Sequence, residues 1–249
     1  YGHFDIFIIP SEGGIPRRLT WHSGHDIPFG WSPDGKEISF GARRNRPSYE
    51  ILTVDVGTLK TEVICEDYAT LRYPRWSSDG KMMIYSRYGM PWYRPRYRGS
   101  AAAQVWAYNI ETKKRSKLLA DAKQYLFSQF MPSGKQILLV TTGQPTPTLA
   151  NIEEKPVKFT DNSQRTPNLW SSDLEGNLKQ ITHFKTDSVR YPSIASKTGD
   201  IAFEHGDGIW LLPNKSKTPQ KIPLIVNTDS KRNAQEHVRA TSGVTEAEP

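Results

Sequence analysis

Cysteine and long apolar segments are both scarce in this sequence. Cys65 is the only cysteine in 249 residues, which excludes an internal disulfide and a zinc site built from several cysteines. No apolar run is long enough to cross a membrane as a helix. The sequence also lacks a Gly-x-Ser-x-Gly elbow, a phosphate-binding glycine loop and a His-Glu-x-x-His motif. The residues therefore indicate no catalytic group, and we expect no cofactor.

Negative charge is missing from one long stretch. The chain carries 33 Lys and Arg against 26 Asp and Glu, a net charge of +7. No carboxylate occurs between Asp79 and Glu111, so this stretch holds much of the positive charge.

The opening residues already resemble a strand, and no signal peptide is visible.

A short polar motif recurs along the chain. Residues 31–36 read Trp-Ser-Pro-Asp-Gly-Lys, residues 76–81 read Trp-Ser-Ser-Asp-Gly-Lys, and looser copies occupy 130–135 and 196–200. A short apolar run follows each copy, as expected when a tight turn leads into a strand. Glycine permits the positive φ of such a turn, and Asp or Ser can bond to the local backbone. The residues predicted to shape these turns are Asp34, Gly35, Asp79, Gly80, Gly134 and Gly199.

A second hairpin follows each of these turns, so one repeat contains four antiparallel strands, which is a propeller blade. We expect an all-β fold, a β-propeller with about four and a half blades visible. A β-sandwich or a series of unrelated hairpins is the alternative. The predicted segments are 1–27 (outer half of a blade), 28–72 (blade), 73–127 (blade with a basic aromatic insertion), 128–190 (blade with an insertion), 191–235 (blade) and 236–249 (link to a following domain).

The repeats resemble a known family. The turn at 32–36, with the Asp-Ile-Phe-Ile-Ile-Pro strand at 5–10, is similar to the PD40 repeat, a WD40-like repeat of bacterial TolB and tricorn-type proteases. Residues 180–193 and 90–108 resemble parts of the amino-terminal six-bladed propeller of tricorn-like S41 peptidases. The resemblance implies a non-catalytic segment, with the serine peptidase site in later domains, and about one and a half blades absent before Tyr1.

Two insertions indicate which face of the propeller binds. Residues 87–103, which we call the lip, and residues 143–167 both lie between the second and third strands of a blade. Both are therefore expected on the face opposite the Ser-Pro-Asp-Gly turns, and long loops on a rigid scaffold often carry binding sites. The lip interleaves arginine with aromatic residues, which suits the binding of carboxylates or phosphates, stacking and protein interfaces. The candidate binding residues are Arg87, Trp92, Tyr93, Arg94, Arg96, Tyr97 and Arg98.

Other interpretations of these segments stay open at this stage. The lip aromatics could simply pack on the blade while the arginines face water. Nucleic-acid binding is a further option, but no binding motif accompanies the basic stretch. His22, His25 and Asp26 could ligate a metal, although a structural role at a blade junction is the stronger interpretation. We expect Trp31 and Trp76 to pack between blades and Cys65 to be a buried filler.

Two functions fit the sequence. The first is the non-catalytic propeller of a tricorn-like peptidase, which would bind or filter peptides and act as a scaffold for the other domains. The second is a stand-alone TolB-like interaction propeller in the periplasm. The expected partners are a peptide, a protein or other domains of the same polypeptide, with no nucleic acid and no membrane insertion. A periplasmic or secreted location is expected, with a cytoplasmic one as the alternative.

Overall fold

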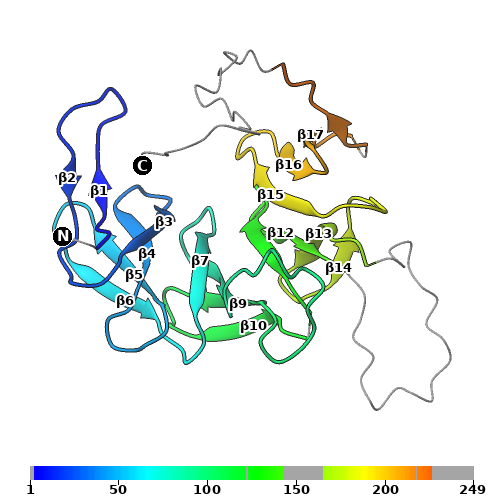
Figure 1. Cartoon of the computed structure of the whole chain (residues 1–249). Coiled ribbons are helices and arrows are strands. Elements are labelled where there is room, and N and C mark those ends of the chain that lie inside the picture. The colour runs from blue at the N-terminus through cyan, green and yellow to red at the C-terminus, as the bar shows by residue number, and fades with distance from the viewer. Residues whose placement is uncertain (1–2, 122, 143–164, 217, 226–249) are drawn as a thin grey trace, which may run out of the picture.

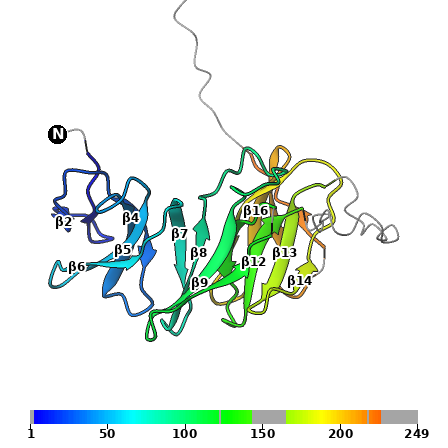
Figure 2. The ribbon, with the colours of Figure 1, turned by 90° about the horizontal axis from the view of Figure 1, so that it is seen from below.

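The structure is a computed structural model that describes residues 3–121, 123–142, 165–216 and 218–225. These residues form strands and contain no helix. Four four-stranded antiparallel sheets and one two-stranded sheet follow one another along an arc (Figure 1). A view turned by 90° shows successive sheets standing side by side (Figure 2). The prediction of an all-β propeller with four blades and one half blade is confirmed.

The strands follow the repeat. The half blade contains β1 (Phe7–Ile8) and β2 (Arg17–Arg18). Blade 1 contains β3 (Ile27–Trp31), β4 (Glu37–Ala42), β5 (Glu50–Asp55) and β6 (Thr61–Cys65). Blade 2 contains β7 (Leu71–Trp76), β8 (Met82–Arg87), β9 (Gln104–Asn109) and β10 (Arg115–Leu119). Blade 3 contains β11 (Leu126–Phe130), β12 (Gln136–Thr141), β13 (Asn168–Asp173) and β14 (Leu178–Gln180). Blade 4 contains β15 (Val189–Ile194), β16 (Ile201–His205), β17 (Gly208–Leu212) and β18 (Gln220–Lys221).

The repeated turns join the first two strands of each blade. In blade 2, the Ser77 hydroxyl donates to Asp79 Oδ1 at 2.6 Å and accepts the Met82 N–H at 2.9 Å. Gly80 closes the turn by donating its N–H to the Ser77 carbonyl, with φ at +71°. The other three turn glycines also have φ between +68° and +76°. A side chain would strain this backbone, which explains why glycine recurs there.

The core lies between the blades. Alternate residues of β12 face opposite ways: Ile137 and Leu139 pack with blade 2, whereas Leu138 and Val140 pack with blade 4. The second strand of a blade is therefore covered on both faces, which explains its continuous apolar sequence. Cys65 is buried between blades 1 and 2, as predicted, and burial raises the pKa of its thiol.

The first strand of each blade lies on the inner side of the arc. β3, β7, β11 and β15 contact one another in series, and each contains a bulge near its middle. Trp76 packs against the cluster between blades 1 and 2, as predicted. The prediction for Trp31 is wrong, because 51% of its surface is exposed. β3 contacts β7 of blade 2, whereas the half blade that packs against blade 1 has only two strands, and Trp31 is not part of the cluster between them.

Candidate functional site

The lip is anchored at both ends. At its start, the Tyr88 N–H donates to the Thr70 carbonyl at 2.9 Å, and Ser86 donates to the Gly89 carbonyl. At its end, the buried Gln124 side chain accepts the Ala103 N–H at 2.7 Å. The same amide donates to the Arg94 carbonyl at 3.3 Å, so one side chain ties the middle of the lip to its end. The lip is a folded loop on a fixed base.

Arg87 belongs to this base. Its guanidinium makes two hydrogen bonds with the Asp67 carboxylate, at 3.0 and 3.1 Å, and contacts the rings of Tyr88 and Trp106. The pair lowers the pKa of Asp67 and raises the pKa of Arg87, so each stabilises the charged form of the other. Arg44 and Asp26 make a similar contact at 2.7 Å in blade 1. The contacts of Arg87 therefore indicate a structural role, in which it holds β8 to the loop before β7.

Arg98 also contacts the scaffold. Its backbone forms a β-bridge with Lys123, which is buried and pairs with Asp121 at 3.2 Å. Loss of hydration on burial lowers the pKa of Arg98, and the neighbouring Arg165 adds to this effect. Arg96 donates from Nε to the Arg165 carbonyl at 3.3 Å. Of the lip arginines, Arg94 and Arg96 are the ones that remain exposed.

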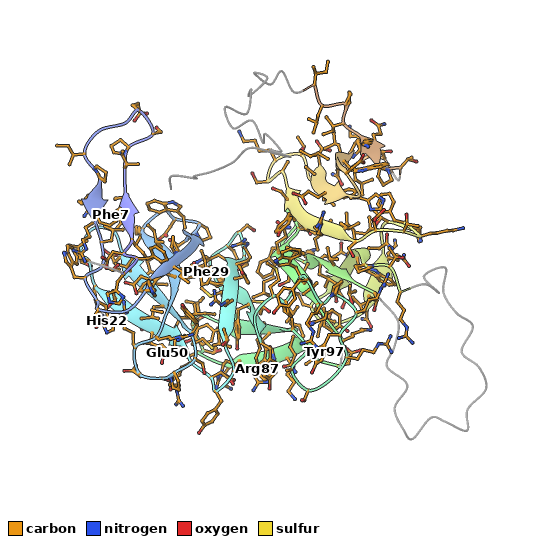
Figure 3. The ribbon with its side chains drawn as sticks, in the orientation of Figure 1. Phe7, His22, Phe29, Glu50, Arg87 and Tyr97 are labelled. Atoms are coloured by element: carbon orange, nitrogen blue, oxygen red, sulfur yellow. The ribbon has the colours of Figure 1, made fainter. Side chains whose placement is uncertain are left out.

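Four aromatic residues form a band along the inner side of the arc. Phe29, labelled in Figure 3, lies 5.5 Å from Tyr73, and Phe127 lies 5.1 Å from Tyr191, measured between ring centres. We call Phe29, Tyr73, Phe127 and Tyr191 the axial band. Each comes from the bulge of an inner strand, and three have positive φ values of +47° to +55°. Non-glycine residues rarely adopt this conformation, which is often found at functional sites.

The lip reaches the axial band through Met90 and Trp92. The Met90 sulfur accepts the Phe127 N–H at 3.3 Å, and the Trp92 ring lies 6.0 Å from the Tyr191 ring. Met90 also lines a cavity of about 70 Å³ with Tyr73 and Phe127. The lip therefore lies against the inner strands, next to the axis of the propeller.

A groove separates the lip from blade 4. Two neighbouring hollows, of about 270 and 360 Å³, share Tyr93, Pro95 and Ser188 in their linings, and we call the two together the lip groove. Trp92 and Tyr93 line it and are 40% and 70% exposed. Its remaining lining residues are Arg94, Arg96, Tyr97, Asp187, Arg190 and Gly206.

The groove offers several kinds of contact. Arg94 and Arg96 border one hollow, whereas Asp187 and Arg190 border the other. The Arg94 guanidinium stacks on the Tyr97 ring at 4.6 Å, which orients it. The structure thus brings five of the seven predicted residues to the groove: Trp92, Tyr93, Arg94, Arg96 and Tyr97.

The axial band and the blade 4 wall of the groove were not among the predicted site residues. A signal for part of them exists in the sequence, because Arg-Tyr-Pro occurs at 72–74 and again at 190–192. That motif precedes a repeat turn, but it does not reveal a bulge or the side on which the aromatic ring lies. The second insertion lies outside the described residues from 143 to 164.

The histidines near the half blade have backbone partners. His25 Nδ1 accepts the Phe4 N–H at 3.1 Å, and His22 Nδ1 accepts the Gly24 N–H at 2.9 Å. Asp26 is fully buried and pairs with Arg44. Within the described ranges, no group of three His, Cys, Asp or Glu side chains could hold a metal ion. The same ranges contain no helix that could span a membrane.

Known proteins of similar structure share the propeller. TolB from Acinetobacter baumannii superposes with a TM-score of 0.62 at 17% identity, covering 86% of this chain and 47% of that chain. An oligogalacturonate lyase in complex with manganese superposes with a TM-score of 0.60 at 13% identity, covering 88% of this chain and 59% of that chain. At these identities the likeness concerns the fold alone.

The sequence itself has matches. The "Uncharacterized protein Atu1656" of Agrobacterium fabrum is 24% identical over 149 residues, which cover 57% of this chain and 44% of that protein. This chain thus matches less than half the length of that relative. The profile of the tricorn protease N-terminal beta propeller domain matches residues 1–218. The chain therefore belongs to the family of tricorn protease N-terminal β-propeller domains.

Proposed function

We propose that this chain is a non-catalytic, peptide-binding propeller domain of a tricorn-like peptidase, and that the lip groove holds the peptide. The observation that carries this proposal is the pair of exposed aromatic residues, Trp92 and Tyr93, on a loop that is anchored beneath them. Exposed aromatic side chains on a fixed base lose little conformational entropy on binding and are often hot spots. The bound peptide would be selected before it reaches catalytic domains elsewhere in the parent protein.

The alternative is a stand-alone TolB-like propeller that binds a folded protein. The fold shared with TolB supports it, because that likeness covers most of this chain. A periplasmic location belongs to the same proposal. Fractionation of cells that express the complete natural protein, followed by detection in periplasm and cytoplasm, tests the location directly.

The test of the groove is a binding measurement. A fluorescein-labelled, unstructured twelve-residue peptide that contains Phe, Pro, Lys and Glu is titrated with the protein, and anisotropy is recorded. We expect Trp92→Ala combined with Tyr93→Ala to weaken binding by about tenfold or more. Tyr68→Ala is the matched control, because Tyr68 is an exposed aromatic on the same face outside the groove.

Two outcomes would contradict the proposal. One is equal loss of peptide binding in the Tyr68 control and in the groove variant. The other is no peptide binding by the parent domain, together with tight binding of a folded protein, which would favour the stand-alone alternative.

A further inference from the structure

A second cationic cluster lies on the same face as the lip, at the junction of blades 1 and 2. The guanidinium carbons of Arg43 and Arg72 lie 4.5 and 4.2 Å from the centre of the Tyr49 ring. Arg43 follows β4, Tyr49 precedes β5, and Arg72 belongs to β7. The Leu71 N–H donates to the Tyr49 carbonyl at 3.0 Å and fixes the two blades together at this point.

The two charges repel each other. Both contact one ring, so they are at most about 9 Å apart, a separation that salt at physiological strength screens only in part. Among the residues that the structure describes, neither arginine has a carboxylate within ion-pair distance. The cluster therefore holds two positive charges that no described carboxylate neutralises.

The described acidic side chains near the cluster make no ion pair with Arg43 or Arg72. Glu50, next to Tyr49, is fully buried, and its Oε1 accepts the Asn45 N–H at 3.2 Å. The other acidic side chains around the junction pair with different arginines: Asp26 with Arg44, Glu66 with Arg46, and Asp67 with Arg87. These contacts leave Arg43 and Arg72 available to an anion from outside.

Arg75 adds a third charge farther along β7. Its Nη1 donates to the Phe29 carbonyl at 3.1 Å and to the Pro74 carbonyl at 3.3 Å, so it bonds to neutral groups. Its side chain reaches solvent, yet the surrounding protein removes part of its hydration and lowers its pKa. The positive charge thus continues from the cluster toward the axial band.

We propose that Arg43, Tyr49 and Arg72 form a binding site for the carboxylates of an acidic peptide segment. Stacking on Tyr49 orients both guanidinium groups and leaves their edges free, and a guanidinium edge binds a carboxylate through two parallel hydrogen bonds. The Tyr49 ring already carries two guanidinium groups, which disfavours stacking of a nucleobase on it.

This inference goes beyond the lip groove and depends on the proposed function only in taking a peptide as the carrier of the carboxylates. The test uses two labelled probes, acetyl-(Glu)4-amide and acetyl-(Gln)4-amide, with anisotropy recorded at low and at physiological salt. We expect the protein to bind the glutamate probe in preference to the glutamine probe. Arg43→Gln and Arg72→Gln should each weaken binding of the glutamate probe by about tenfold.

Arg17→Gln is the matched control. Arg17 donates to the Val56 carbonyl on the opposite face, so its removal changes the net charge equally without touching the cluster. Tyr49→Leu keeps both arginines but removes the ring on which their guanidinium groups stack. We therefore expect weaker binding of the glutamate probe although the net charge is unchanged. Arg43 is exposed, so Arg43→Gln should fold even if Arg72→Gln does not. Circular dichroism checks the fold of each variant.

Several results would overturn the inference. If Arg17→Gln and Arg43→Gln weaken binding of the glutamate probe equally, the net charge of the protein alone attracts the probe. Displacement by inorganic phosphate at a lower concentration than by glutamate, or tighter binding of a short single-stranded RNA, would show a different ligand. If Trp92→Ala combined with Tyr93→Ala abolishes binding of the mixed peptide while both cluster variants leave the glutamate probe unaffected, the proposed function stands and this inference fails.

Discussion

The two ends of the blades are built in different ways. At one end, the turns between the first two strands repeat the same hydrogen bonds, from Ser32 and Asp34 in blade 1 and from Ser77 and Asp79 in blade 2. At the other end, the loop between the second and third strands runs from 88 to 103 in blade 2 but contains only Gly206 and Asp207 in blade 4.

This difference separates scaffold from site. A tight turn must satisfy its own backbone within a few residues, so its sequence is restricted and recurs. A loop that the neighbouring blades already support can vary in length and composition, and binding residues collect there. The repeated motif therefore marks the end of the blade at which we do not place binding.

The largest expected effect lies on the lip face. Asp26→Ala removes the partner of Arg44 from a site where the carboxylate is fully buried, and we expect unfolding free energy to fall by about 3 kcal/mol. Lys36→Ala, which removes an exposed pair with Asp34 at 3.8 Å on the turn face, should cost less than about 1 kcal/mol. Urea denaturation measures both. Equal losses would mean that Asp26 does not brace blade 1.

A matched pair of glycines tests the two ends directly. Gly80 in a repeat turn and Gly89 in the lip have φ values of +71° and +75°. At both positions an added Cβ atom would have no neighbouring atom within 4 Å. Alanine at either position should cost about 1 kcal/mol through backbone strain alone. Only Gly89→Ala should also weaken peptide binding in the anisotropy assay. Weakened binding in Gly80→Ala would break the separation between scaffold and site.

The smallest expected effect is a difference in pH dependence. His205, on the lip face, is buried and stacks on Phe184 at 3.7 Å, and loss of hydration lowers its pKa from the ordinary 6.5. A depressed folded-state pKa means that its contribution to stability is present above pH 6.5 and is lost as pH falls through the folded value.

Asp79, on the turn face, has a pKa below its ordinary 3.8 because Ser77 donates to it. Its contribution is therefore lost only in more acidic solution. Urea denaturation from pH 7 to pH 2 should show that His205→Leu flattens the upper part of this profile and that Asp79→Asn flattens the part below the ordinary Asp pKa of 3.8. The interpretation of His205 is wrong if its replacement leaves the upper part unchanged.

Much of the fold was predictable because a blade is a local unit. The spacing of the turn glycines and the apolar runs after them gave the strands, and their order gave the face on which the lip lies. The contacts of the predicted site residues were harder to predict from the sequence. Arg87 and Arg94 look alike in sequence. However, Arg87 is bound by Asp67, which lies 20 residues earlier in the chain, whereas Arg94 stays exposed beside the groove.

By itself, the sequence determined the blade, the four turns and the face that carries the lip, because each follows from residues that are neighbours along the chain. Only the tertiary structure decided which lip residues meet in the groove and which brace the blades. It also decided that Tyr73, Phe127 and Tyr191 form a band, and that Arg43 and Arg72 meet at Tyr49. The physical reason is that these contacts join different blades, and no local repeat records how separate blades pack.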